Sequence, residues 1–261
     1  MYHYCKHDAF CKIVRSGKLW ASDVLCMDDR TEIKYAFTEV IRPVVDERDE
    51  NGDTRYYLRA VASPEVVRDV WRTWCTHVAC FSATAELPSQ WEKYASCTGY
   101  AIGFDQRGLD EWCRARKIAL FPMNYELPRQ QEMVREFFEG EKVVELRRLA
   151  SKSCKDQMVH EIRSHANKYL ASLTQSVKSK YWSDQQEWRI LVIQKEGQKG
   201  FGSFTRPDGV CCFELPICTA DIVTEVVLAP HFSSDQGAIR LLLRDAGLSS
   251  VVIRPSASGC P

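Results

Sequence analysis

The chain has 261 residues, of which 45% are hydrophobic and 27% charged, a composition typical of a soluble globular protein. Its 35 basic and 35 acidic side chains give a formal net charge of zero, so no overall charge excess favours nucleic acid or an acidic membrane surface. No apolar run approaches the roughly 18 residues of a membrane-spanning helix, and the polar N-terminus does not form a signal peptide. We therefore expect a cytoplasmic protein without membrane contact.

The 12 cysteines are scattered, and no Cys-x-x-Cys pair occurs. Zinc ribbons and redox motifs need that spacing, so we expect no metal site. In a cytoplasmic setting the thiols are expected to be reduced, many of them buried as small hydrophobic groups. The motifs GxGxxG, HExxH and GxSxG and the phosphate-binding P-loop are absent, which leaves dinucleotide folds, zinc proteases and serine hydrolases without motif support.

The first half of the chain predicts short strands that alternate with helices. Residues 43–56 are charged and rich in turn formers, so we expect an exposed loop there. The expected strands are 2–4, 19–22, 78–82, 99–105 and 118–125, and the expected helices are 8–15, 31–40, 64–74, 90–94 and 109–116.

The second half begins with a segment, about 128–180, that has few glycines and a helical period, which predicts helices inserted into a mixed sheet. Between 151 and 180 there are six Lys or Arg residues and two acids, typical of a solvated helix face or of a surface for nucleic acid or a phosphate-bearing partner. Beyond the insert we expect strands at 188–193, 210–215, 223–228 and 251–254 and a helix at 238–246. This irregular order favours an α+β fold over a doubly wound sheet, with one domain over 1–261.

The stretch from Lys180 to Ile193 organises the chain. Apolar residues alternate from Trp188 onward, as in a half-buried strand. Glu187 and Arg189 occupy the opposite face, so a carboxylate and a guanidinium point the same way where the strand begins. A structural ion pair at the end of a strand explains the same pattern.

Other polar and aromatic side chains lie at spaced positions along the predicted elements. Each has a structural explanation: an edge-strand histidine, helix-capping acids, or aromatic residues of the core. A functional site requires them to converge. The set comprises His3 in the first strand, Ser22 and Ser82 at strand ends, Asp29 and Glu32 at a helix start, and Trp91 and Tyr94 on one helical face.

The order and spacing of these motifs resemble a bacterial family known as the domain of unknown function 2971 (DUF2971). The segments that carry the resemblance are Tyr2-His3-Tyr4, Ser16 to Ser22, Met27 to Glu32, Cys80-Phe81-Ser82 with Trp91 and Tyr94, Gly99 to Phe104, and Lys180-Tyr181-Trp182 with Glu187 to Ile190. The sequence departs from the family pattern at Cys5, Asp28 and Arg30, where Thr, Asn and Pro are usual.

The layout is also similar, in pattern order, to ADP-ribosyltransferase-like folds. This resemblance implies a mixed or antiparallel split sheet with flanking helices and a helical insert, and NAD as the substrate. It further implies that Glu187 faces the oxocarbenium-like charge at the ribose carbon, as carboxylates do in glycoside cleavage. Arg189 would bind phosphate or orient Glu187. Ser82 would support Glu187.

The same resemblance assigns NAD-binding roles to His3, Tyr4, Ser22, Asp29, Trp91 and Tyr94. Here His3 would bind the adenosine-side ribose, and Tyr4 or Tyr94 would stack on nicotinamide. The leading hypothesis is therefore an NAD-dependent ADP-ribosyltransferase or NAD glycohydrolase, as in a toxin or antiphage-defence effector, with a protein or nucleic-acid acceptor. The alternatives are a nucleic-acid-acting enzyme that modifies RNA or DNA ends or bases on the same scaffold, using the basic helices, and a non-catalytic binding module.

Overall fold

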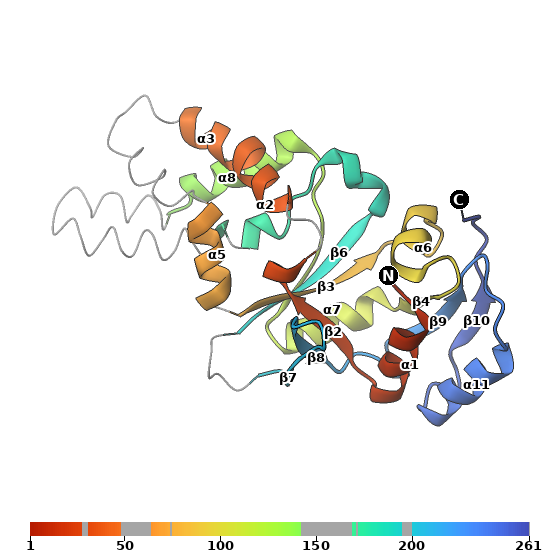
Figure 1. Ribbon diagram of the computed structural model, residues 1–261. Helices are drawn as coiled ribbons and strands as arrows, with labels where there is room; N and C mark the ends of the chain where they lie inside the picture. Colours follow the sequence, from red (N-terminus) through yellow and green to blue (C-terminus); the bar gives the residue numbers. More distant parts are fainter. Residues whose placement is uncertain are drawn as a thin grey trace. The chain divides into compact units, whose positions relative to one another are not determined.

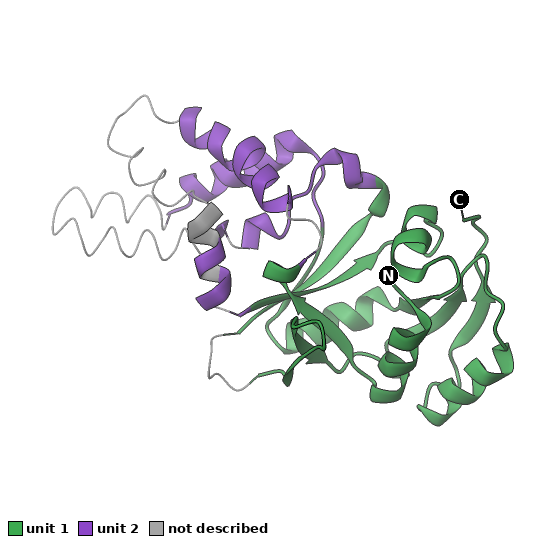
Figure 2. Ribbon diagram, viewed as in Figure 1, with its two compact units in different colours: residues 1–26, 76–122, 184–261 green, residues 27–75, 123–183 purple. Residues whose placement is uncertain are grey.

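The structure is a computed structural model that describes residues 1–27, 31–47, 64–73, 75–141, 169–170, 172–194 and 200–260. The chain divides into two compact units, which are described separately (Figure 2). Unit 1 consists of residues 1–26, 76–122 and 184–261, and unit 2 of residues 27–75 and 123–183. The expected insert at 128–180 thus shares a unit with an N-terminal segment, and the single-domain assignment stays a prediction.

Unit 1 contains a mostly antiparallel open sheet of ten strands with flanking helices, which confirms the α+β class (Figure 1). β9 and β10 are parallel, and the other paired strands are antiparallel. The strands are β1 (Tyr2–Cys5), β2 (Leu19–Asp23), β3 (Thr76–Ser82), β4 (Tyr100–Phe104), β5 (Ala119–Pro122), β6 (Glu187–Ile193), β7 (Ser203–Thr205), β8 (Cys211–Leu215), β9 (Val223–Leu228) and β10 (Val252–Pro255).

The sheet forks at β3. One edge of β3 pairs with β6 along its whole length. The other edge pairs with β1 only at Ser82, opposite Tyr2, and with β2 at His77 and Val78. One branch therefore continues through β1, β4, β9 and β10, and the other through β2, β8 and β7. The ADP-ribosyltransferase-like split sheet stays a prediction.

The helices of unit 1 begin and end where the sequence supplies the local signals. Gly17 adopts the left-handed conformation that stops α1, with φ at 68°. Asp105 and Asp235 cap α7 and α11 by accepting backbone N–H groups, each over 2.7 Å. The helical segments are α1 (His7–Ser16), η1 (Val24–Cys26), α6 (Pro88–Ala95), α7 (Gln106–Ala115) and α11 (Gln236–Asp245).

Unit 2 is helical in its described parts. Gln130 is fully buried and accepts a hydrogen bond from the Tyr35 hydroxyl over 2.8 Å, while its amide donates to the carbonyls of Asn124 and Lys178. The helices are α2 (Thr31–Tyr35), a π-helical turn η2 (Ala36–Ile41), α3 (Arg42–Glu47), α5 (Pro64–Thr73) and α8 (Leu127–Glu139), and the 3-10 helix η4 (Lys180–Gln185) crosses the boundary between the units.

The expected loop at 43–56 is wrong over its first residues. Residues 42–47 form α3, and Val44 and Val45 are buried. The charges around them misled the sequence interpretation, because the two valines supply an apolar side to the turn. Residues 48–56 lie outside the described part of the chain.

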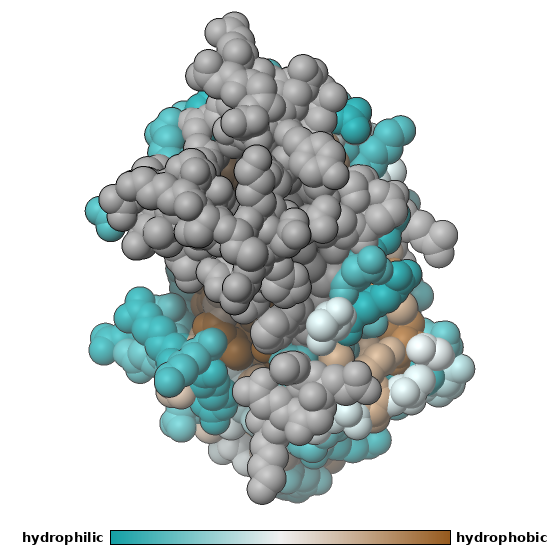
Figure 3. Space-filling view, turned by 90° about the vertical axis from the view of Figure 1, so that its left-hand side faces the viewer, coloured by the Kyte–Doolittle hydropathy of each residue, from teal (hydrophilic) through white to brown (hydrophobic). Residues whose placement is uncertain are grey.

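The remaining expected strands and helices are confirmed with small shifts, where the structure describes them. The strand expected at 118–125 is shorter, and β7 was not expected. Most of the predicted insert, residues 142–168, lies outside the described ranges. No helix in the described segments is both long and apolar enough to span a lipid bilayer. On the face drawn in Figure 3, the coloured residues are mainly hydrophilic, with smaller hydrophobic areas among them.

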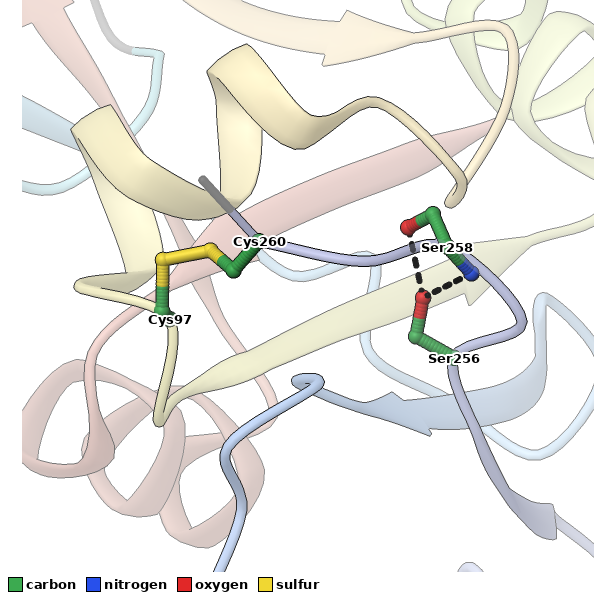
Figure 4. The surroundings of a disulfide bond; sticks show 4 residues. All are labelled: Cys97, Ser256, Ser258 and Cys260. Atoms are coloured by element: carbon green, nitrogen blue, oxygen red, sulfur yellow. Dashed lines mark hydrogen bonds between the residues drawn. A yellow bond between two sulfur atoms is a disulfide. The ribbon is translucent and has the colours of Figure 1, made fainter.

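The expectation that all thiols are reduced is wrong for one pair. Cys97 and Cys260 form a disulfide across 163 residues of sequence, with their Cα atoms 6.1 Å apart (Figure 4). Because the two cysteines are so far apart in sequence, no local motif indicated that they pair. Free thiols remain at Cys5, Cys11, Cys26, Cys113, Cys211, Cys212 and Cys218.

Candidate functional site

The candidate site in unit 1 is centred on the first residues of β6. Arg189 donates through Nε to Oε1 of Glu187 over 2.6 Å, and the side chains are 0% and 9% exposed. The two residues lie on the same face of the strand, as the alternation predicted. A buried carboxylate beside a guanidinium is an oriented negative charge with little access to water, which suits stabilisation of a developing cation.

Ser82 contacts the backbone turn that precedes Glu187. It stands directly opposite Glu187 in the β3–β6 register, and its hydroxyl donates to the Gln185 carbonyl over 2.6 Å. The adjacent Ala83 N–H donates to the Gln186 carbonyl over 3.0 Å. Gln186 has φ at 45°, which a non-glycine residue rarely adopts. Ser82 therefore contacts the turn that leads into Glu187.

Tyr4 and Trp91 belong to the core of unit 1. Their rings pack edge-on at 4.8 Å, and their exposed fractions are 6% and 0%. The Tyr4 hydroxyl donates to the Thr84 carbonyl over 2.9 Å and accepts the Leu87 N–H over 3.3 Å. Burial raises the pKa of Tyr4 far above its usual value. Both rings fix α6 against β1, and this packing occupies the Tyr4 ring expected to stack on nicotinamide.

Tyr94 is the aromatic residue of α6 that remains accessible, with 38% exposure. The Lys93 ammonium lies 5.0 Å from its ring centroid. Burial raises the pKa of the Tyr94 hydroxyl, nearby Lys93 opposes the rise, and the charges of Cys80 and Glu187 add to it. Of the two tyrosines expected at nicotinamide, Tyr94 is therefore the accessible one.

His3 lies in β1, next to the fork where β1 and β2 pair with different parts of β3. Its Nδ1 lies 3.0 Å from the Cys80 carbonyl, which can only accept, so Nδ1 carries the hydrogen. Burial lowers the pKa of His3, and this hydrogen bond opposes the effect. β1 is an interior strand, so the edge-strand explanation is wrong.

The side chains of His3 and Glu187 leave opposite faces of the sheet. Tyr2 pairs with Ser82 and Ser82 with Glu187, which puts these three residues on one face. His3 has the other parity and meets Phe81 edge-on at 6.1 Å. A ligand that contacts both His3 and Glu187 must therefore reach across the fork.

One predicted residue, Ser22, does not join this group. Ser22 pairs with Val78 and approaches Cys212, with 3.9 Å between Oγ and Sγ. Val78 is four residues from Ser82 along β3, so Ser22 is displaced by roughly 13 Å along the strand direction. Asp29 lies outside the described residues.

Cys80 and Lys93 are neighbours of the site that the sequence analysis did not select. Cys80 stands opposite Arg189 in the β3–β6 register, with the same parity as Ser82, and this parity was readable from the strand. Lys93 precedes Tyr94 on an exposed turn of α6. Among the described residues, no group of three or more His, Cys, Asp or Glu side chains is arranged to hold a metal ion.

Residues 90–190 match a family model described as "Protein of unknown function (DUF2971)". Over this segment the chain is similar to the DUF2971 family. The matched segment begins in α6 and ends in β6, so it contains Trp91, Tyr94, Glu187 and Arg189. Neither a curated protein nor a solved structure gives a significant match to this chain.

Proposed function

We propose that this protein cleaves the glycosidic bond between nicotinamide and ribose in NAD, with Glu187 facing the reacting ribose carbon. The observation that carries the proposal is the buried Glu187–Arg189 pair, joined over 2.6 Å where β6 begins. The fork at β3 supports it, because the layout agrees with the split sheet expected from the ADP-ribosyltransferase resemblance.

The chemistry needs an anion and a positioned leaving group. The glycosidic bond breaks with both electrons going to nicotinamide, which leaves as a neutral molecule, and positive charge develops on the ribose. The Glu187 carboxylate stabilises this charge, and the hydrogen bond from Arg189 fixes its direction. The acceptor, or water, then adds to the ribose carbon and loses its proton to solvent.

The remaining roles follow from accessibility. Tyr94, rather than the buried Tyr4, stacks on nicotinamide. Ser82 acts through the turn before Glu187. The dinucleotide crosses the fork, and Nε2 of the neutral His3 accepts a hydrogen bond from a hydroxyl of the adenosine-side ribose.

A nucleic-acid-acting enzyme is the second candidate, and one feature of unit 2 favours it. Tyr181 is 80% exposed and packs edge-on with Trp182 at 4.9 Å. The neighbouring Lys180 side chain is 77% exposed. An accessible aromatic ring beside a lysine suits a stacked base and its phosphate. Lys152, Lys155 and Arg163 of the predicted basic helices lie outside the described residues, and charge reversal there tests this alternative.

NAD-induced thermal stabilisation tests the proposed binding site separately from the chemistry. Wild type and Glu187→Gln should both unfold at a higher temperature with NAD, because a ligand that binds the native state stabilises it and glutamine keeps the shape of glutamate. Tyr94→Ala should lose most of this shift. Glu225→Gln is the matched control, because it neutralises a Glu–Arg pair of equal length (2.6 Å to Arg254) elsewhere on the sheet. No shift for wild type contradicts the proposal, whereas a shift without turnover favours a non-catalytic binding module.

A further inference from the structure

We propose that Cys97 and Cys260 are a reversible redox pair that exchanges with a dithiol reductant, and that their disulfide holds residues 256–260 against helix α6. The disulfide joins Cys97, which follows the Ser96 cap of α6, to Cys260, the last described residue of the chain (Figure 4). This inference does not depend on NAD chemistry.

The backbone at the Cys97 end is held in an uncommon conformation. Ser96 and Cys97 have φ values of 51° and 56°, two successive non-glycine residues in the left-handed region. The Cys97 N–H donates to the Trp91 carbonyl over 2.9 Å, and the His231 N–H donates to the Cys97 carbonyl over 2.9 Å. Such conformations persist where surrounding contacts hold them, and the disulfide is one of these contacts.

The other end of α6 holds the same segment without covalent bonds. The Glu86 carboxylate accepts hydrogen bonds from the Ser256 hydroxyl over 2.5 Å and from the N–H groups of Ala257 and Ser258 over 2.9 and 3.0 Å. Arg254 adds an ion pair to Glu86 over 2.7 Å. Opening the disulfide therefore frees Cys260 and its neighbour, while Glu86 retains residues 256–258.

The disulfide adjoins the buried cluster that packs against α6. Cys260 packs against the buried cluster that contains Tyr4, Trp91 and Ala95. Trp91 and Ala95 lie on α6, which also carries Tyr94. Reduction removes a covalent constraint next to this cluster, so the end of α6 should become more mobile in the reduced protein.

The surroundings of the pair suit reversible chemistry. Cys97 and Cys260 are both half-buried rather than enclosed in the core. The protein also keeps free thiols, such as Cys26 and Cys211. Proteins with free thiols are typical of reducing compartments, where a disulfide is usually transient or redox-sensing.

The exchange balances as a transfer of two electrons and two protons. A thiolate of the dithiol attacks one protein sulfur, and the other protein sulfur leaves as a thiolate that takes a proton. The second thiol of the reductant then attacks the mixed disulfide. The products are Cys97 and Cys260 as thiols and the reductant as a cyclic disulfide.

Alkylation under native conditions, read by peptide mass spectrometry, tests the pair. After oxidation with oxidised glutathione, Cys97 and Cys260 should resist iodoacetamide while Cys26 reacts. After dithiothreitol without denaturant, both should react completely, and renewed oxidation should restore protection. Failure of the disulfide to form, or its persistence in excess dithiothreitol, overturns the proposal.

Hydrogen exchange then tests the effect on α6. Reduction should speed exchange at residues 95–99 and 259–260 by about tenfold and leave β6 unchanged. Cys260→Ser should reproduce the reduced pattern without reductant, and Cys26→Ser should behave as wild type. Equal exchange in the oxidised and reduced proteins would show that the disulfide does not constrain the helix.

Discussion

Arg189 and Glu187 form a charge pair that is almost completely removed from water, with Nε and Oε1 2.6 Å apart. The pair is created by two consecutive same-face positions of β6, and its direction is fixed by strand pairing on both sides of β6. Each charge compensates for the other in the interior, so removal of one side chain leaves the other charge buried without this partner.

Removal of the guanidinium alone should therefore destabilise the fold. Arg189→Ala leaves a buried carboxylate without this partner, and we expect a loss of about 3–5 kcal/mol in the free energy of unfolding. Urea denaturation measures it. The double variant Glu187→Gln, Arg189→Met should lose less than the sum of the single changes. A loss below about 1 kcal/mol for Arg189→Ala would mean that water reaches the carboxylate.

Ser82→Ala should weaken the turn that carries Glu187. The hydroxyl donates a buried 2.6 Å hydrogen bond to the Gln185 carbonyl, and its loss should cost about 1–3 kcal/mol of unfolding free energy. Ser89→Ala is the matched control, since its exposed hydroxyl donates to Asp184 over 3.1 Å in the same region. Equal losses in the two variants would argue against a special role for Ser82.

The strand at Glu187 could be predicted because its alternation is local. The same alternation put Arg189 and Glu187 on one face, and the structure agrees. The relation of His3 to Glu187 could not be predicted, because it depends on the register between β1 and β3 through one residue pair, Tyr2 with Ser82. A shift of one residue in that register would exchange the faces.

Gly103→Ala should destabilise the sheet where β1, β4 and β9 meet. A Cβ atom at residue 103 would lie 2.7 Å from Cγ of Glu225 and 3.1 Å from Cε1 of Tyr2. The Tyr2 hydroxyl donates to Glu225 over 2.6 Å, so the clash also strains this contact. We expect a loss of about 1–3 kcal/mol, measured by thermal or urea unfolding. Gly259→Ala, with no atom within 4 Å of the added Cβ, should be near neutral.

Glu86 should make the stability of the protein sensitive to acid. Partial burial acts to raise its pKa, but hydrogen bonds from Ser256, Arg254, Ser258 and Ala257 outweigh this and lower the pKa to about 2. Because the folded pKa lies below the usual 4.5, the stabilisation is complete above pH 4.5 and disappears as the pH falls toward 2.

Melting temperatures across this pH range test the Glu86 contribution. Wild type should lose more stability than Glu86→Gln between pH 4.5 and 2, so the two curves should converge in acid. Parallel curves would contradict the assignment, since the other carboxylates titrate in both proteins.

Contacts between residues that are far apart in the chain could not be predicted from the sequence. Cys97 and Cys260 are 163 residues apart, and no spacing rule pairs them. The ADP-ribosyltransferase resemblance offered Tyr4 or Tyr94 for the nicotinamide, and the sequence does not show that Tyr4 packs against Trp91. Tyr94 differs from Tyr4 in exposure, which a helical period alone does not give.

Release of nicotinamide from NAD, followed for wild type beside Glu187→Gln and Glu225→Gln, tests the central claim most directly. The account predicts release by wild type and by Glu225→Gln, and a loss of at least about a hundredfold in Glu187→Gln, because the transition-state charge loses its anion. Equal release by wild type and Glu187→Gln, or no release by wild type with any offered protein, nucleic-acid or water acceptor, would contradict it.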